Sequence, residues 1–319
     1  GTDYAAVFGG TAGTVTLGSN IKANRLTFNT TGYLLKTNPL TLNGSSPTIT
    51  TSTGVTTTIS SAISGTASWV KAGPGTLKLT SAANTNNGNT TINEGTLSLT
   101  GTGKLYSNLG WGSRTVSINN GATLEVDRWD GNGCLGQLDY SVGNLVINGG
   151  TIRFTGNSNG TAEGQGFTIG AGGATIQSDA SSGQWNINLD VRFSNTNYGI
   201  ASNSGGMLHL TGAGNGLISK VIPGNGGLTK SGAGTWSLTN TNTYTGDTTV
   251  NGGILSLGNG SSPTGLANTA HVIVAAGAYF FLLPLGLTNS LVGLALIHAA
   301  LGAPFVLITV SATLSGLDQ

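Results

Sequence analysis

The chain has 319 residues and a formal net charge of +1 at pH 7, and only 7% of its residues are charged. This balance argues against electrostatic recognition of nucleic acid or of an anionic membrane, and no run of basic residues is present. A hydrophobic content of 37% argues against charge-driven disorder, because it supplies enough apolar side chains for a core. The length suits two ordinary domains or one long solenoid.

Alternating polar and apolar residues begin near the N-terminus and recur in short segments. The first segments span residues 14–17, 25–28 and 40–42, and Gly or Asn follows each of them. Such period-two alternation bounded by turn residues predicts half-buried β-strands. Further segments of this kind are residues 76–79, 115–118, 123–126, 145–147, 151–154, 167–169, 174–176, 185–189 and 207–210. No convincing amphipathic helix precedes residue 285.

One stretch occurs twice, at Lys71–Leu99 and at Lys230–Leu257. Each copy contains a glycine turn, an alternating strand, an Asn/Thr-rich corner and two further strands. The matching pairs are Lys71 with Lys230, Gly73 with Gly232, Gly75 with Gly234, Gly88 with Gly246, Asn93 with Asn251, and Leu97–Leu99 with Leu255–Leu257. One such unit has too few apolar residues to bury a face alone, so the duplication predicts the stacked coils of a β-solenoid.

The duplicated stretch resembles the passenger-associated repeat of bacterial autotransporters. Asn242-Thr243-Tyr244-Thr245-Gly246 is a close match to the corner of that repeat, and Asn84–Gly88 is a looser one. The resemblance implies an all-β fold, a right-handed single-stranded parallel β-helix, exported to the cell surface, whose repeats are structural rather than catalytic. We expect this solenoid to occupy residues 1–277, in about a dozen coils of roughly 20–30 residues.

The alternation also predicts which side chains of the two copies point into the solenoid. Lys78 and Ser237 fall on outward positions. The expected inward residues are Leu77, Leu79, Ile92, Leu97 and Leu99 in the first copy, and Trp236, Leu238, Val250, Leu255 and Leu257 in the second.

Most of the acidic residues lie in the midsection of the chain, between residues 124 and 190. Four of them leave two interpretations open: Glu125, Asp127, Asp130 and Asp139. We favour a solvated outer face in which Asp127 lies beside Arg128. The alternative is a carbohydrate-binding or polysaccharide-degrading β-helix, because glycoside hydrolysis needs two carboxyl groups about 5–9.5 Å apart. Trp129 would then stack on a sugar.

Other motifs predict no catalytic, cofactor or metal site. Residues 156–160 match the G-x-S-x-G form, but they lie in a Gly/Asn loop without a following helix, so we interpret them as a turn. The three histidines are far apart in the sequence and have no cysteine near them, which disfavours a metal site; they are His209, His271 and His298. Cys134 is the only cysteine, so no intramolecular disulfide forms, and we expect a small buried apolar residue.

The C-terminal segment, residues 278–319, differs in character, since no charged residue occurs between Asp247 and Asp318. Its strongly apolar runs are either the last coils of the solenoid or a docking surface for another subunit. The candidate self-assembly residues are Tyr279, Phe280, Phe281, Leu282, Leu283, Phe305, Val306 and Leu307. A membrane anchor at residues 291–310 is the less favoured alternative, because Gly and Pro interrupt the run and no basic residue flanks it.

The absence of a catalytic motif predicts a structural protein and not an enzyme, and the resemblance implies that it lies in the extracellular space or at the bacterial cell surface. The expected roles are adhesion, biofilm formation or head-to-tail assembly into a surface filament. The expected partners are copies of the same chain, surface polysaccharide or a host cell surface, with no nucleic acid and no cofactor.

Overall fold

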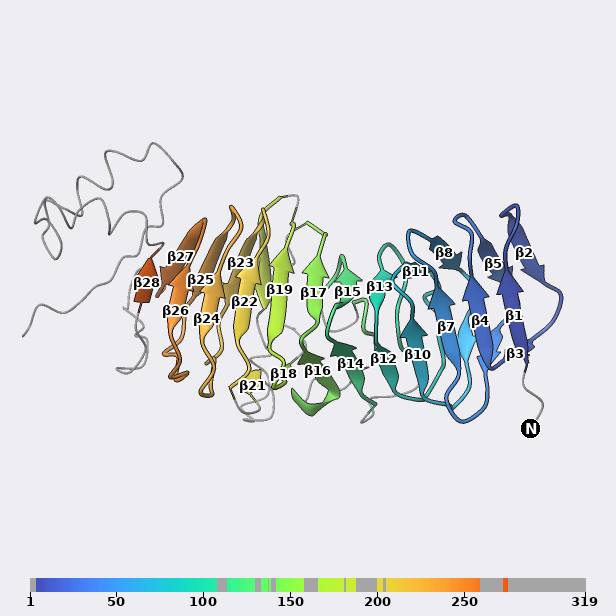
Figure 1. Cartoon of the computed structure of the whole chain (residues 1–319), viewed down its shortest axis with the longest axis horizontal. Coiled ribbons are helices and arrows are strands. Elements are labelled where there is room, and N and C mark those ends of the chain that lie inside the picture. The colour runs from blue at the N-terminus through green and yellow to red at the C-terminus, as the bar shows by residue number, and fades with distance from the viewer. Residues whose placement is uncertain are drawn as a thin grey trace, which may run out of the picture.

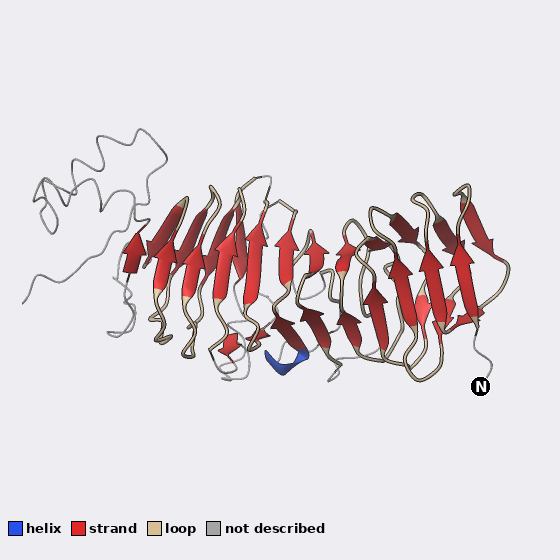
Figure 2. Ribbon diagram, viewed as in Figure 1, coloured by secondary structure: helices blue, strands red, loops and turns tan. Residues whose placement is uncertain are grey.

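The computed structural model describes residues 4–107, 114–129, 133–136, 138, 142–157, 166–180, 182–187, 200–202, 205–258 and 272–274. Within these ranges the chain forms parallel β-strands and a single 3-10 turn, Val142–Asn144. The strands stack into an elongated rod with the N-terminal strands at one end and β28 at the other (Figures 1 and 2). The fold is therefore the predicted β-solenoid, and its coils wind in the right-handed sense usual for parallel strand crossovers (Figure 1).

Sheet B runs along the whole of the rod and contributes one strand to each coil. Its strands are β2 (Thr14–Leu17), β5 (Leu34–Thr37), β8 (Thr56–Ile59), β11 (Thr76–Leu79), β13 (Gly95–Leu99), β15 (Ala122–Val126), β17 (Thr151–Phe154), β19 (Ala174–Ser178), β22 (Leu208–Thr211), β24 (Leu228–Lys230), β26 (Thr248–Val250) and β28 (Val272–Val274). These 12 strands agree with the predicted dozen coils.

Sheet A and two shorter sheets form the other faces. Sheet A consists of β1 (Ala5–Phe8), β4 (Arg25–Phe28), β7 (Thr48–Thr51), β10 (Trp69–Ala72), β12 (Thr90–Ile92), β14 (Val116–Asn119), β16 (Leu145–Asn148), β18 (Phe167–Ile169) and β21 (Ile200–Ser202). Sheet C, near the N-terminus, consists of β3 (Ile21–Ala23), β6 (Leu40–Leu42) and β9 (Ile63–Ser64). Sheet D, in the second half, consists of β20 (Gln184–Ile187), β23 (Asn215–Ile218), β25 (Thr235–Leu238) and β27 (Ile254–Leu257).

The two copies of the duplicated stretch occupy different pairs of sheets. In the first copy β10 and β12 lie in sheet A, whereas β11 and β13 lie in sheet B. In the second copy the equivalent strands β24 and β26 lie in sheet B, and β25 and β27 lie in sheet D. The repeat has therefore moved by one face of the solenoid between its two occurrences.

The core consists of columns of inward side chains that stack from coil to coil. One column in sheet B is in strict register and fully buried, and it comprises Leu77, Leu97, Leu124, Ile152, Ile176 and Leu210. Burying one such side chain contributes roughly 1.5–3 kcal/mol. The inward residues predicted from the alternation are confirmed as buried, except that Leu257 is only partly buried, and Lys78 is exposed as predicted.

An aromatic cluster fills the interior where sheet D begins. The Trp185 ring stacks on Phe154 with ring centroids 5.0 Å apart. It also meets Trp129 at 5.3 Å and Trp236 at 6.1 Å, both edge-on. All four rings are buried. Large aromatic side chains therefore pack the core in the coils where the repeat changes face.

A left-handed glycine begins each copy of the duplicated stretch. Gly73 and Gly232 both have φ of +74°, a conformation that residues with a Cβ adopt rarely. A Cβ at either position would also collide with a backbone carbonyl oxygen of the preceding coil, that of Thr51 or Gly212. Glycine is therefore required at this turn by conformation and by space.

The N-terminal end of the solenoid contains one strand that the alternation did not identify. The strand β1 precedes the first segment that alternation identified, because all four residues of Ala5–Phe8 are apolar and no polar residue alternates with them. The C-terminal segment 278–319, with its candidate self-assembly residues and the run 291–310, lies outside the described residues. No helix among the residues that the structure describes is long and apolar enough to cross a membrane.

Candidate functional site

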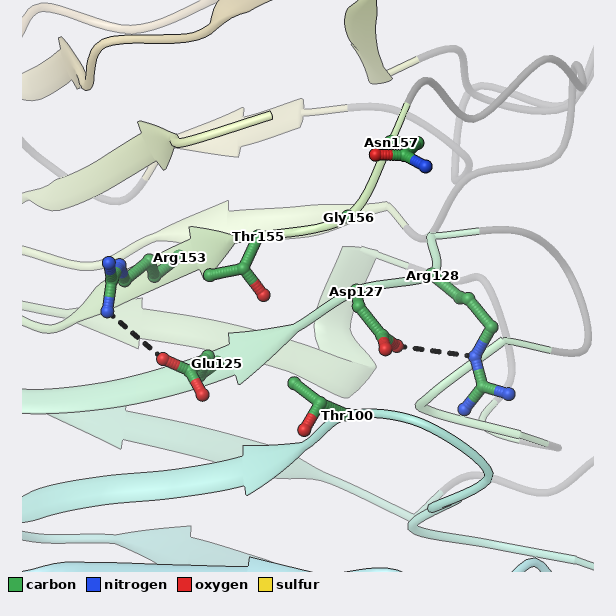
Figure 3. Close-up of a pocket in the computed structure, with 8 residues that line it drawn as sticks. All are labelled: Thr100, Glu125, Asp127, Arg128, Arg153, Thr155, Gly156 and Asn157. Carbon is green, nitrogen blue, oxygen red and sulfur yellow. Dashed lines mark hydrogen bonds and ion pairs between the residues drawn. The ribbon is translucent and has the colours of Figure 1, made fainter. Parts of the chain in front are cut away.

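An open hollow of about 700 Å³ lies on the outer face of sheet B, at the middle of the rod (Figure 3). It is bordered by the ends of β13, β15 and β17 and by the loops that follow them. Its lining residues are Thr100, Glu125, Asp127, Arg128, Arg153, Thr155, Gly156 and Asn157. The hollow therefore includes two of the four acidic candidates, Glu125 and Asp127.

Strand alternation places these side chains in columns. Glu125 and Asp127 are two residues apart and both partly exposed, so they share the outer face, as predicted. The register aligns Ser98 with Glu125 on the next coil and Glu125 with Arg153 on the coil after that. Since neighbouring strands lie about 4.8 Å apart, side chains in one column contact each other directly.

The first column forms a continuous polar ladder across four strands. The Ser98 hydroxyl donates to Glu125 Oε1 at 2.8 Å, and Arg153 Nη1 donates to Glu125 Oε2 at 3.1 Å. Arg153 Nε donates to Asp179 Oδ2 at 2.7 Å, and Gln177 Nε2 reaches the same oxygen at 2.7 Å. Burial raises the pKa of Asp179, but the hydrogen bonds from Arg153 and Gln177 outweigh burial and hold the pKa below its usual value of 3.8. The hydrogen bond to Asp179 in turn raises the pKa of Arg153.

The second carboxylate, Asp127, is held by its own strand end and by the loop beside it. Its Oδ2 accepts the backbone N–H of Gly101 at 2.6 Å, and its Oδ1 lies 3.4 Å from Arg128 Nε. The Cys134 thiol donates to Asp127 Oδ1 at 3.3 Å. Burial raises the pKa of this thiol, so Cys134 is a buried, protonated residue as its isolation in the sequence suggested.

Each oxygen of both carboxylates therefore has a partner within the fold. Glu125 is paired with Arg153, and Asp127 lies beside Arg128, which agrees with the favoured interpretation of a solvated outer face. The hollow carries two acidic and two basic side chains, so its formal charge balances. Such a surface suits a neutral polar ligand better than an ion of either sign.

Several of the predicted site residues lie elsewhere. Asp130, Asp139, His271 and His298 fall outside the described residues, as do the last three positions of the G-x-S-x-G match. The alternative in which Trp129 stacks on a sugar is wrong, because its side chain is 3% exposed and packs edge-on against Trp185 in the core. His209 is exposed on β22. In the part of the chain that the structure describes, no three His, Cys, Asp or Glu side chains gather to hold a metal ion.

A pair of buried lysines was not predicted from the sequence. Lys71 Nζ donates to the carbonyl oxygens of Ala72, Gly73 and Glu94, at 3.0, 2.6 and 2.9 Å. Lys230 makes the matching contacts in the second copy, to Ser231, Gly232 and Gly252, at 2.7, 2.9 and 2.9 Å. Burial lowers the pKa of both lysines to about 8.

These lysines lie in columns that are otherwise aliphatic. The register places Lys71 between Ile49 and Ile92, and Lys230 between Leu210 and Val250. A lysine would be expected on an outward position. Each of these lysines instead points inward, and its ammonium group binds the carbonyl oxygens of the glycine turn that follows it. Two features of the sequence could have predicted their burial. Both copies of the repeat have lysine at this position, and the alternation places that position on the inward face of the strand.

A buried hydrogen bond between a tyrosine and a threonine also occurs in both copies, but the tyrosine comes from different positions of the chain. In the second copy Tyr244 bonds Thr248, with 2.7 Å between the hydroxyl oxygens. In the first copy Asn86 occupies the position of Tyr244, and Tyr106 from a later part of the chain bonds the equivalent Thr90 at 2.9 Å. Burial raises the pKa of Tyr106 and Tyr244 to about 12. The tyrosine–threonine hydrogen bond is therefore present in both copies, although the tyrosine comes from a different position in each.

The fold and the duplicated coil define a parallel β-solenoid that contains two copies of one repeat. The passenger-associated-transport-repeat family matches residues 70–99 and 228–257, the two copies described above. The chain is also 52% identical over 119 residues to the adhesin BmaC autotransporter of Brucella suis biovar 1 (strain 1330). That region is 37% of this chain but only 3% of the adhesin, so the chain corresponds to a small part of its relative. No solved structure matches the chain.

Proposed function

We propose that this chain is a structural length of an adhesive passenger, displayed outside the bacterial cell. The observation that carries the proposal is sheet B, whose 12 parallel strands continue through both repeats without interruption. The matched relative is named an adhesin, which supports an adhesive role for this chain as well. Stacked coils and ladder hydrogen bonds make such a rod stiff, and a stiff rod holds its outer faces away from the cell.

Display of the chain on non-adherent bacteria tests this proposal. We expect cells that carry residues 1–319 to attach to host cells or to a coated surface more than cells that carry the display scaffold alone. A variant with Leu97→Asp is the matched control, because a buried charge in the core prevents the solenoid from stacking. Attachment at the level of the bare scaffold, with the rod folded on the surface, would contradict the adhesive role.

The proposed role is not enzymatic. Both oxygens of Glu125 and of Asp127 are engaged within the fold, which supports a role for these two carboxylates other than catalysis. The assay is incubation with soluble polysaccharides followed by measurement of new reducing ends. Depolymerisation that is abolished by Glu125→Gln would replace this proposal with the hydrolase alternative.

We also propose that copies of the chain assemble head to tail into a filament. An exposed apolar patch on the first coil supports this, since Val7 is 70% exposed and Tyr4 is 48% exposed, and β1 pairs with β4 alone among the described strands. Open strand edges template pairing with another chain, and a contact of this kind does not close on itself. The apolar residues 279–283 and 305–307 are the partner surface in this proposal.

Light scattering and electron microscopy of the purified chain test the assembly. We expect rods longer than one molecule, and shorter ones for Val7→Lys, which places a charge on the open edge. Thr16→Lys, also on an outward position of an early strand, is the control. A monomer that stays soluble at high concentration would rule out the filament while leaving the adhesive role intact.

A further inference from the structure

We infer that the outer face of sheet B is a binding track for a neutral linear glycan, which lies along the axis of the rod. The inference rests on the proposed adhesive role and names the class of ligand. The track is defined by six threonines in one column and by the hollow beside them. The six are Thr56, Thr76, Thr96, Thr123, Thr151 and Thr175.

The six threonines form an unbroken row. Consecutive strands β8, β11, β13, β15, β17 and β19 each place one of them at the same register position. Every one is partly exposed and alternates with a buried inward neighbour. Five intervals of about 4.8 Å give a row roughly 24 Å long. This interval is comparable with the length of one pyranose residue in an extended glycan.

The hydroxyls of this row are free to bind a ligand. None of the six has a side-chain hydrogen bond to any residue that the structure describes. Other polar side chains on the same face contrast with them, because Ser98, Glu125 and Arg153 are bonded to one another. Each threonine hydroxyl offers one donor and two acceptor positions, which is the same set that a sugar hydroxyl offers.

The surroundings of the row favour a neutral polyhydroxylated ligand over a protein. Protein interfaces are anchored by aromatic and other large apolar side chains. The large exposed apolar side chains of the described residues are Tyr4, Val7, Ile21 and Met207, and none of them belongs to β8–β19. On the same strands, Glu125 and Arg153 follow Thr123 and Thr151 by two residues and line the hollow. The hollow balances Glu125 and Asp127 against Arg128 and Arg153 (Figure 3). A row of unpaired hydroxyls beside a charge-balanced hollow selects a ligand without net charge.

The test is affinity electrophoresis of the whole chain in gels that contain a glycan. Hydroxyethylcellulose and a linear mannan are the neutral probes, and polygalacturonate is the anionic comparison. The track variant is Thr123→Val with Thr151→Val, which removes two hydroxyls and keeps the shape and strand preference of the side chains. The matched control is Thr48→Val with Thr50→Val, two outward threonines on β7 in sheet A.

We expect the wild-type chain to be retarded by at least one neutral probe. The track variant should bind that probe about tenfold or more weakly, because it loses two hydrogen bonds, and the control should bind as the wild type does. Circular dichroism checks that both variants are folded. The inference is overturned if neither neutral probe retards the wild type, if only polygalacturonate does, or if the track variant and the control behave alike.

Cell attachment separates this inference from the role on which it rests. Displayed wild-type rods that attach to host cells, and track variants that attach equally well, would overturn the glycan track and leave the adhesive role standing. Loss of attachment in the track variant together with loss of glycan retention supports both. If the track variant instead abolishes association between purified rods and leaves glycan retention unchanged, the row is a contact between copies and the inference fails.

Discussion

Lys71 and Lys230 make the same three backbone contacts in the two copies of the repeat, although Lys71 lies in sheet A and Lys230 in sheet B. In each copy the ammonium group binds the next carbonyl, the carbonyl of the left-handed glycine, and a carbonyl at the equivalent turn one coil later. The lysine therefore joins two successive coils. The repeat therefore determines how two successive coils are joined, and it does so both in sheet A and in sheet B.

The first prediction concerns Lys71→Met. Methionine fills a similar volume but donates no hydrogen bond, so three buried carbonyl oxygens lose their shared donor. We expect the free energy of unfolding to fall by about 1–3 kcal/mol, the usual cost of leaving a buried polar group unsatisfied. Urea unfolding at constant temperature measures the change.

Two further variants complete that experiment. Lys230→Met should give a similar loss, since its contacts are equivalent. Lys78→Met, at an exposed position of the next strand, should change the free energy by about 0.5 kcal/mol or less. A Lys71→Met protein as stable as the Lys78→Met protein would show that the three contacts add nothing.

The second prediction is a rise in stability between about pH 8 and pH 10. The pKa of both buried lysines is about 8 in the folded chain and near 10.5 when exposed. In that interval the unfolded chain binds more protons than the folded chain, so the free energy of unfolding increases with pH. Above about pH 10 the two tyrosines act in the opposite direction, because their pKa is raised to about 12 in the folded state.

Urea midpoints measured across this range reveal the slope. The Lys71→Met/Lys230→Met double variant serves as the comparison, since it has lost both titrating groups and should lack the rise. A stability that falls steadily from pH 8, with the same slope in both proteins, would contradict the prediction.

Much of the fold was readable from the sequence because a β-solenoid is built from local rules. Alternation marks the strands, glycine and asparagine mark the corners, and the repeat at Lys71–Leu99 and Lys230–Leu257 marks the stacking. The movement of the repeat from sheets A and B to sheets B and D was not readable. Alternation within one strand carries no information about which sheet the strand joins, because that is decided by packing between coils.

The candidate site was readable only in part, for a similar reason. Period two placed Glu125 and Asp127 on one face, as the structure has them. The partners of Glu125 come from neighbouring coils more than twenty residues away, Ser98 and Arg153, so no local pattern identifies them. Asp127, by contrast, lies beside Arg128, its neighbour in the sequence. Trp129 was misassigned because an aromatic residue beside acidic residues suggests a sugar site, whereas burial of its large apolar surface decided its position.

The third prediction is that Leu97→Asp destabilises the rod by more than about 3 kcal/mol. Leu97 is fully buried between Leu77 and Leu124 in the central column, so the substitution removes apolar burial and introduces an unpaired charge. Thermal unfolding followed by circular dichroism measures the loss. Thr96→Asp, on the adjacent outward position, is the control and should stay close to the wild type. Equal melting temperatures for the two variants would refute the inward assignment.

The last prediction concerns Arg153, which joins Glu125 on the preceding coil to Asp179 near the following one. The guanidinium is 41% exposed, so its ion pairs are screened by water, and Arg153→Gln should lower the free energy of unfolding by only about 1 kcal/mol or less near neutral pH. The clearer effect is on titration. Burial already raises the pKa of Asp179 and the Arg153 hydrogen bond lowers it, so the variant should show a higher pKa for Asp179.

The sign of the pH effect follows from the lowered pKa of Asp179. A carboxyl whose folded pKa lies below its unfolded value of 3.8 contributes stability above that value, and the contribution is lost as the pH falls through the folded pKa. The wild type and Arg153→Gln should therefore differ near neutral pH and converge in acid. Urea unfolding across this range, with NMR titration of Asp179, measures both effects, and Lys36→Gln at an exposed position of β5 is the control. An Asp179 pKa that is unchanged in Arg153→Gln, or a stability difference that persists in acid, would show that the ladder across sheet B does not hold this carboxylate in its ionised form.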